Sequence, residues 1–165
     1  MFIVHGTKKF RDRVNGQKPE SAEHPTTALG NWYATVLFTR PQAALFVNEF
    51  TLMPILVHLA PAATVIERFP SAAAAVFGRL GLNEAFIRSE GQEMAEHRLM
   101  KTQSRSLLGS MNEFAFMAKV YCDEDGGYDP VDLSLKLSEV PCGPLYPRQV
   151  SPDRELTAFV AECWG

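Results

Sequence analysis

Cysteine is scarce in this sequence of 165 residues, and its three copies form no recognisable pattern. Cys122, Cys142 and Cys163 are odd in number, widely spaced and outside any C-x-x-C pair. Such spacing suggests neither a disulfide framework nor a zinc knuckle. We therefore expect reduced thiols, which indicate a cytoplasmic protein, and no metal site.

Long apolar runs and nucleotide-binding motifs are missing as well. The longest apolar stretch, residues 52–66, is too short to span a bilayer and contains Pro54 and Pro61. No secretory signal follows Met1, so we expect no membrane as a partner. The motifs G-x-G-x-x-G and G-x-x-x-x-G-K-[ST] do not occur, which disfavours a P-loop enzyme and a simple Rossmann domain. No cofactor is expected.

The overall composition predicts a single folded domain over residues 1–165. Hydrophobic residues make up 46% of the chain and charged residues 21%, near the averages of globular proteins. The net charge of -3 argues against a protein that coats nucleic acid non-specifically, because such binding depends on an excess of lysine and arginine. The charge is uneven, with residues 1–18 basic and residues 120–165 acidic. Such an asymmetry orients a partner or only keeps the protein soluble.

Local patterns predict an α+β fold, in which a small antiparallel sheet with a β-hairpin packs against several helices. A short strand is expected at residues 2–5 and a hairpin at residues 29–50, where aromatic and β-branched residues flank a proline-containing turn. A third strand is expected at residues 53–59. The main helices are expected at residues 64–80 with an interruption at Pro70, 84–101, 110–121, from 130 onward, and 153–164.

Several helix starts have recognisable caps. Thr7 is expected to cap a short helical turn, Asn83 the helix that follows it, and Asp129 a helix that opens with a proline. Ser110 and Glu113 match a capping box, in which a serine and a glutamate satisfy backbone N–H groups. This box predicts a helix that begins at Ser110.

The most metal-like group of side chains is Glu90, Glu93, Glu96 and His97. Glu93 and His97 share a helical face at i,i+4 spacing. The group has no second histidine and matches neither H-E-x-x-H nor the E-x-x-H of di-iron bundles. We interpret it as a solvated helix face.

Residues 101–113 concentrate hydrogen-bond donors ahead of the predicted helix start. Free backbone N–H groups and the helix dipole attract an anion there, and cationic and amide side chains strengthen that attraction. The segment therefore predicts a site for a phosphate or a carboxylate. Its candidate ligand-binding residues, with one from the N-terminal segment, are Lys8, Lys101, Thr102, Arg105, Ser106, Ser110 and Asn112.

A purely structural interpretation of the same segment stays open. In that interpretation Ser110 and Glu113 only cap a helix, Gly109 permits a turn, and Arg105 bridges to the acidic tail. No convincing general base accompanies the segment. Catalytic residues are therefore left unassigned, and so is the question of whether the protein is an enzyme.

The same residues carry a resemblance to a known family. The stretch K-T-x-x-R-S-x-L-G-S-M-N from Lys101, with G-T-K-K-F from Gly6 and L-G-N-W-Y-A from Leu29, resembles a bacterial family of uncharacterised proteins, a domain of unknown function. The resemblance implies a stand-alone bacterial cytoplasmic domain. It brings no established activity, substrate or catalytic residue.

Two classes of function follow from these observations. The first is a non-enzymatic module for protein interaction or regulation, which predicts an exposed apolar or charged patch. The second is a small enzyme or binder that acts on a phosphate-bearing ligand such as a nucleotide or RNA. It predicts that the basic N-terminal segment folds beside residues 101–112. The partners considered are therefore a protein and a phosphate-bearing ligand, and the lack of a catalytic constellation favours the first class.

Overall fold

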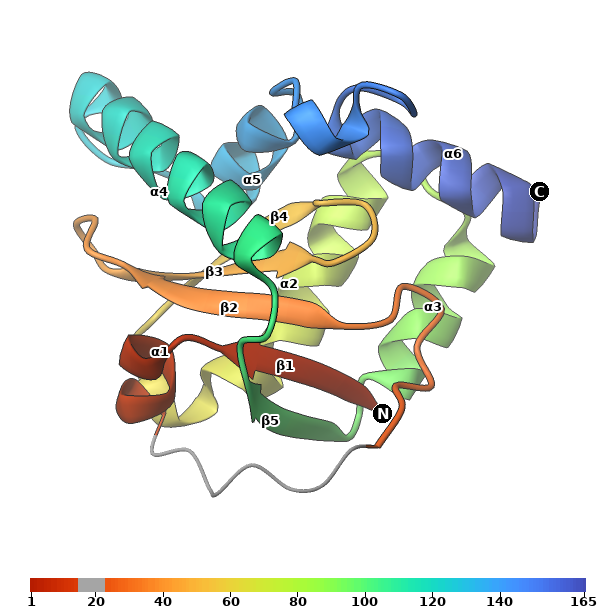
Figure 1. The fold of residues 1–165 in the computed structure, drawn as a ribbon, viewed down its shortest axis with the longest axis horizontal. Coiled ribbons are helices and arrows are strands. Elements are labelled where there is room, and N and C mark those ends of the chain that lie inside the picture. Colours follow the sequence, from red (N-terminus) through yellow and green to blue (C-terminus); the bar gives the residue numbers. More distant parts are fainter. Residues whose placement is uncertain (15–22) are drawn as a thin grey trace.

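A computed structural model describes residues 1–14 and 23–165, and these form an α+β fold around one five-stranded sheet (Figure 1). The strands lie in the order β4-β3-β2-β1-β5. Their bounds are β1 Phe2–Gly6, β2 Trp32–Leu37, β3 Ala43–Asn48, β4 Pro54–His58 and β5 His97–Lys101. The predicted fold class is confirmed.

The three strands β2, β3 and β4 form an antiparallel meander, as the sequence predicts. Thr35 of β2 lies opposite Leu45 of β3, which in turn lies opposite Leu56 of β4. Side chains on both faces of these strands are buried, because helices cover the sheet from both sides. This coverage on both sides explains why the sequence of these strands is apolar on both faces.

The first strand makes the sheet mixed. β1 pairs in parallel with β2 on one side and with β5 on the other. The expected helix over residues 84–101 is therefore wrong in its second half, since α3 (Glu84–Glu93) ends early and residues 97–101 form an edge strand. Pairing with β1 outweighs the good helix propensity of Arg98, Leu99, Met100 and Lys101.

One face of the sheet carries the larger core. It is covered by α1 (Lys8–Arg13), α2 (Val65–Arg79), α3 and part of α6 (Pro152–Trp164). Phe69 of α2 lies at its centre, with its ring centroid 4.3 Å from that of Phe46 and 4.9 Å from that of Trp32. The helix α2 runs without a break through Pro70, so the expected interruption does not occur.

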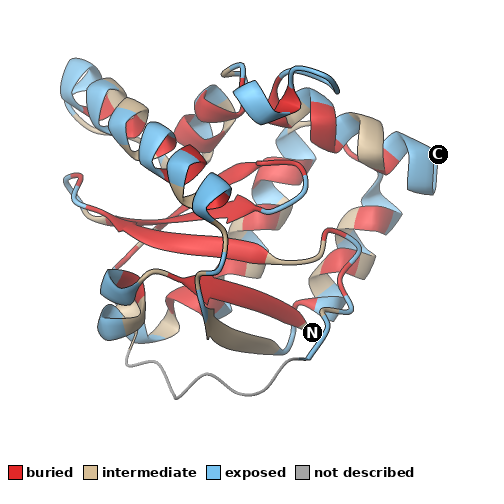
Figure 2. Ribbon diagram, viewed as in Figure 1, coloured by how far each residue is buried: buried red, intermediate tan, exposed pale blue. Residues whose placement is uncertain are grey.

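The opposite face is covered by α4 (Arg105–Asp125) and α5 (Pro130–Ser138), which pack on β2, β3 and β4. Figure 2 shows that α4 presents one buried and one exposed side along its length. The short 3-10 turns at Ala62–Thr64 and Gly143–Leu145 complete the described elements. None of the helices in the described ranges has both the length and the apolar character that crossing a bilayer requires.

Most predicted caps are confirmed, but the start of α4 is not. Thr7, Asn83 and Asp129 each accept a backbone N–H at the start of their helix. Helix α4 begins at Arg105, with Ser104 as its cap, so the capping box at Ser110 is wrong. Ser110 lies in the second turn of a continuous helix, where the neighbouring backbone groups are already paired.

Candidate functional site

The pairing of β1 with β5 brings the basic N-terminal segment beside the predicted anion site. Gly6, the last residue of β1, lies opposite Lys101, the last residue of β5. Thr7 follows directly and fixes the start of α1, because its backbone N–H donates to the Ala34 carbonyl at 3.0 Å and its hydroxyl donates to that of Thr35 at 3.1 Å. In sheets with parallel strands, ligands commonly bind at the carboxyl ends of those strands.

The connection from β5 to α4, residues 101–106, is named here the β5–α4 turn. Two buried side chains of the sheet hold its backbone. Nδ1 of His5 donates to the Lys101 carbonyl at 3.0 Å, and the His5 ring stacks on Tyr33 with centroids 4.8 Å apart. Burial raises the pKa of the Tyr33 hydroxyl, with the charge of Glu49 adding to the rise and a backbone hydrogen bond with Gln103 opposing it.

His5 and Tyr33 were not among the predicted site residues. Their role depends on contacts between distant segments, because His5 and Lys101 are 96 residues apart in the chain. The sequence does contain one signal, a histidine at the end of the apolar strand that begins at Phe2. Since a buried polar side chain requires a hydrogen-bond partner, that position already indicates a polar contact in the core.

The first turn of α4 supplies donors at the β5–α4 turn. The Ser104 hydroxyl accepts the N–H of Leu107 at 3.2 Å, which leaves the N–H groups of Arg105 and Ser106 without an intrahelical acceptor. Lys101, Arg105 and Ser106 are exposed. In the part of the chain that the structure describes, neither Lys101 nor Arg105 forms an ion pair, so the expected bridge from Arg105 to the acidic tail is wrong.

Three of the predicted ligand-binding residues lie apart from this group or have other contacts. Ser110 is only 8% exposed and belongs to the buried side of α4. Asn112 is exposed, but seven residues after Arg105 it lies about 10 Å further along the helix axis. Lys8 lies on α1, two residues after Gly6, and its ammonium forms an exposed pair with Asp12 at 2.9 Å. The residues brought together are therefore Lys101, Thr102, Arg105 and Ser106.

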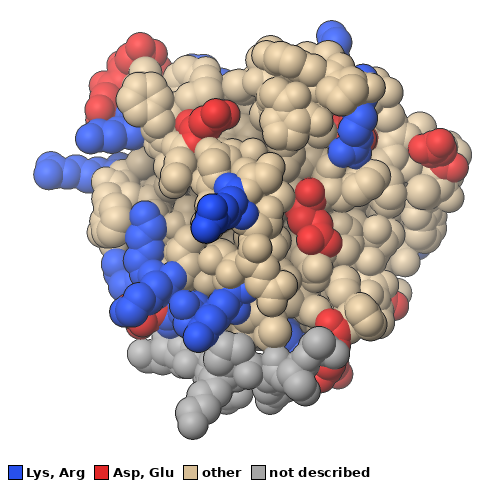
Figure 3. Space-filling model, viewed as in Figure 1, with Lys and Arg blue, Asp and Glu red and all other residues tan. Residues whose placement is uncertain are grey.

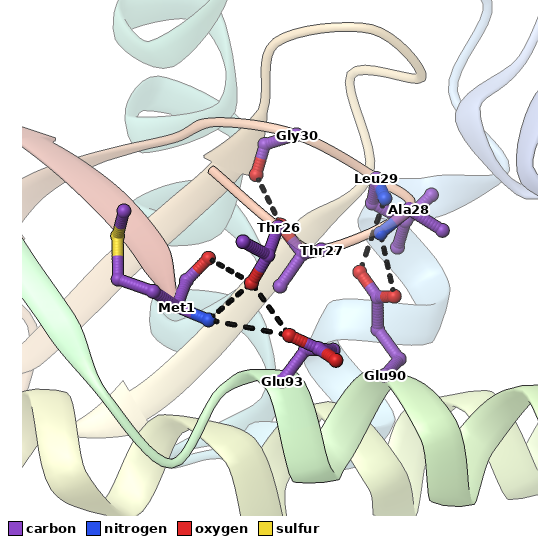
Figure 4. Close-up of polar contacts among 8 residues, drawn as sticks. All are labelled: Met1, Thr26, Thr27, Ala28, Leu29, Gly30, Glu90 and Glu93. Carbon is purple, nitrogen blue, oxygen red and sulfur yellow. Dashed lines mark hydrogen bonds and ion pairs between the residues drawn. The ribbon is translucent and has the colours of Figure 1, made fainter. Parts of the chain in front are cut away.

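Two of the metal-like glutamates, Glu90 and Glu93, are structural, and Figure 4 shows what they contact. Glu90 is 2% exposed, and its two oxygens accept the backbone N–H groups of Ala28 and Leu29 at 2.9 and 3.0 Å. Glu93 accepts the Thr26 hydroxyl at 2.5 Å. The interpretation as a solvated helix face is thus wrong for Glu90. Among the described residues, no group of three histidine, cysteine or acidic side chains has the geometry of a metal site.

A second buried polar group, formed by Asn48 and Thr51, is explained by contacts within the fold. The fully buried Asn48 donates to the carbonyls of Leu29 and Asn31 at 2.8 and 3.2 Å. Its Oδ1 accepts the backbone N–H and the hydroxyl of Thr51, at 2.9 and 3.1 Å. Asn48 and Thr51 therefore fasten the β3–β4 turn to the segment before β2, which is a structural role.

The comparison with protein families identifies the chain. The model of a domain of unknown function, DUF6933, matches residues 3–155. The chain belongs to this family. The DUF6933 match includes the sheet except for Phe2, the β5–α4 turn and every predicted site residue, and it ends near the start of α6. No curated protein and no solved structure is significantly similar to the chain.

Proposed function

We propose that this domain is a binding module for a phosphate-bearing ligand, held at the β5–α4 turn. The observation that supports this most directly is the register between β1 and β5. Because Gly6 lies opposite Lys101, the segment with Thr7 and Lys8 lies beside the turn that leads to Arg105. This is the arrangement that the second functional hypothesis requires.

The chemistry of the turn suits an anion with several oxygens. The guanidinium of Arg105 can donate two parallel hydrogen bonds to a phosphate, and the Lys101 ammonium adds a compact positive charge. The N–H groups of Arg105 and Ser106 and the hydroxyls of Thr102 and Ser106 supply neutral donors. These groups bind and orient an anion, and each acts as a hydrogen-bond donor. We therefore propose a binder rather than a catalyst.

The proposal is tested by titrating the ¹⁵N-labelled protein with pyrophosphate and following backbone amide shifts. The expected result is saturable shifts of the amides of residues 102–107, which are lost in Arg105→Gln and weakened in Lys101→Gln. Arg88→Gln is a matched control, because Arg88 is an exposed arginine on α3, which packs on the face of the sheet opposite to α4. Shifts that are absent, or that persist unchanged in Arg105→Gln, would contradict the proposal.

A second candidate function, the protein-interaction module, has its own supporting observation. Phe116 is 70% exposed, and Val120, one turn later on the same side of α4, is 37% exposed. Asn112 lies one turn before Phe116 on this stripe. The middle of the face that α4 crosses carries few charged side chains, whereas charged side chains gather along its left edge (Figure 3). Exposed aromatic residues in a charge-poor surface are typical of protein interfaces.

Native purification from the source cells distinguishes the two candidates. A stoichiometric protein that copurifies with the wild type and is lost with Phe116→Ser supports the interaction module. Retention of that protein by Phe116→Ser, with loss in Arg105→Gln, would instead assign the contact to the β5–α4 turn. We propose that either function is carried out by one domain in a reducing bacterial cytoplasm, with which its free Cys122, Cys142 and Cys163 agree.

A further inference from the structure

The positively charged side chains of this protein include both paired and unpaired groups. Some form ion pairs, as in Arg79 with Asp132 at 3.2 Å, Lys136 with Asp125 at 3.9 Å and, on α1, Lys8 with Asp12 at 2.9 Å. Others do not. In the described residues, ion pairs are absent from Lys9, Arg40, Lys101, Arg105 and Lys119. Their positive charge is available to an external anion.

Three of these cations, Lys9, Arg40 and Lys119, lie near an exposed aromatic ring. Phe38, directly after β2, is 67% exposed, and the Lys9 ammonium lies 5.5 Å from its ring centroid. Phe38, Arg40 and Lys119 also line one surface hollow between the hairpin tip and the second half of α4. Asp123 is the single carboxylate in that lining. A phenylalanine in this position contributes little to the core, and its exposed ring is accessible to a ligand.

Helix α1 joins the hollow to the β5–α4 turn. At its start, Thr7 is hydrogen-bonded to Thr35 of β2, and at its end Arg13 donates to the Gln42 amide oxygen in the hairpin at 3.1 Å. Figure 3 shows lysine and arginine side chains gathered at the lower left, where Figure 1 shows α1. The turn, α1 and the hairpin tip therefore form one surface, named here the basic surface, with Lys101 and Arg105 at one end and Phe38 and Arg40 at the other.

The length of the basic surface exceeds what one phosphate requires. Gly6 lies opposite Ala34, and Phe38 follows four residues later, which corresponds to about 13 Å along an extended strand. A single phosphate group can contact the cations at only one end of the basic surface. A chain of phosphates contacts both ends, and the ring of Phe38 offers a face on which a base stacks.

We propose that the basic surface binds single-stranded nucleic acid, with phosphates at Lys101, Arg105 and Arg40 and a base stacked on Phe38. This inference rests on the proposed function and specifies its ligand class. A double helix keeps its bases stacked on one another, so it cannot use Phe38 in this way. The overall charge of -3 does not oppose the binding, because the acidic residues are concentrated in residues 120–165, whereas Lys9, Arg40, Lys101 and Arg105 belong to this surface.

The test is fluorescence anisotropy with a labelled 12-nucleotide oligouridylate and the full chain, at several salt concentrations. Phe38→Leu should weaken binding roughly fivefold to a hundredfold, the range that loss of one stacked base produces. Arg40→Gln and Arg105→Gln should each reduce the slope of log K against log salt by about 0.7. A duplex of the same length should bind the wild type more weakly than the single strand.

The controls keep this proposal separate from the proposed function. Arg154→Gln is the matched charge control, since Arg154 is exposed on α6, and it should bind like the wild type. Folding of each variant is checked by its urea midpoint, and Phe38 is exposed enough for substitution to leave the midpoint unchanged. If pyrophosphate still shifts residues 102–107 but Phe38→Leu binds oligouridylate as the wild type does, the nucleic-acid inference is overturned and the anion site stands.

Three other results would overturn the inference. One is tighter binding of the duplex than of the single strand. Another is complete displacement of the oligonucleotide by polyglutamate of equal length, which would indicate an acidic protein segment. The third is failure to bind oligouridylate at low salt. If pyrophosphate also failed to shift the amides of residues 102–107, both this inference and the proposed function would be wrong.

Discussion

The carboxylate of Glu90, on α3, accepts the backbone N–H of Leu29, in the segment before β2, at 3.0 Å. Its second oxygen accepts the neighbouring N–H of Ala28. The buried carboxylate thus supplies the hydrogen-bond acceptors that two backbone N–H groups lack, because residues 28 and 29 lie outside the regular sheet. Leu29 also joins the larger core and gives its carbonyl to Asn48, so the position of this segment depends on both polar side chains.

Replacement of Glu90 should therefore destabilise the fold. In Glu90→Ala two backbone N–H groups lose their acceptor, and we expect a loss of about 2–3 kcal/mol in the free energy of unfolding. Urea denaturation monitored by circular dichroism measures it. Glu96→Ala is the control, since Glu96 is exposed beyond the end of the same helix and should change the free energy little. Equal effects of the two substitutions would contradict the assigned role.

The same carboxylate predicts a pH dependence. Burial raises the pKa of Glu90 above its ordinary value of 4.5, against the lowering effect of the Leu29 and Ala28 N–H groups. The native state then binds more protons than the unfolded state above pH 4.5, so this group makes stability fall as pH rises through its native pKa. Glu90→Gln lacks that titration. The stability of the wild type minus that of Glu90→Gln should decrease from pH 4.5 to pH 7, measured by urea denaturation across that range. A constant or increasing difference would be inconsistent with a raised pKa.

Asn48 should be among the least replaceable polar residues. Asn48→Ala removes an acceptor from Phe50 and Thr51 and a donor from Leu29 and Asn31. We expect a loss on the order of 3 kcal/mol, because several buried groups lose their partner at once. Thermal unfolding followed by calorimetry measures the change. Asn31→Ala is the comparison, since the side chain of Asn31 makes no hydrogen bond to a described residue, and it should cost clearly less.

The helix start at Ser104 gives a fourth prediction. Ser104→Ala removes the cap of α4 and should cost about 1 kcal/mol in the free energy of unfolding. Ser110→Ala, inside the helix, should cost less, because alanine has the higher helix propensity. The two variants are compared by urea denaturation. The opposite order would support a helix that begins at Ser110, as the capping box predicts.

The three thiols should differ in reactivity. Burial raises the pKa of Cys142 to about 11 and also raises that of Cys122, whereas Cys163 is exposed. Because the thiolate is the reactive form, only Cys163 should react quickly with a disulfide reagent at pH 8. The absorbance of the released thiol counts the sites, and Cys163→Ser should abolish the fast phase. Rapid reaction of all three thiols in the native protein would contradict the burial described.

Comparison of the predictions with the structure shows where local sequence is informative. The hairpin, the third strand and the caps at Thr7, Asn83 and Asp129 follow from patterns a few residues long, and the structure contains all of them. Strand β5 does not follow from a local pattern. Leu99, Met100 and Lys101 suit a helix equally well, and only pairing with the distant β1 decides between helix and strand.

The candidate site divides in the same way. Residue type alone selected Lys101, Thr102, Arg105 and Ser106, because donors near a helix start are a local signal. The contribution of His5 depends on a strand pairing between distant segments, which one sequence does not reveal. Ser110 is among the predicted residues only because the helix cap is expected six residues after its actual position at Ser104, and the structure buries Ser110.

The pairing of β1 with β5 also sets the order in which the molecule can fold. The meander of β2, β3 and β4 closes through short connections, whereas His5 meets Lys101 only after 96 residues of chain are brought together. Contacts with large sequence separation form slowly, because loop closure costs entropy before any contact compensates for it. During synthesis the N-terminal strand must wait for residues 97–101 to leave the ribosome. The basic surface is consequently assembled late. In an incomplete chain that lacks β5, the edge of β1 stays exposed.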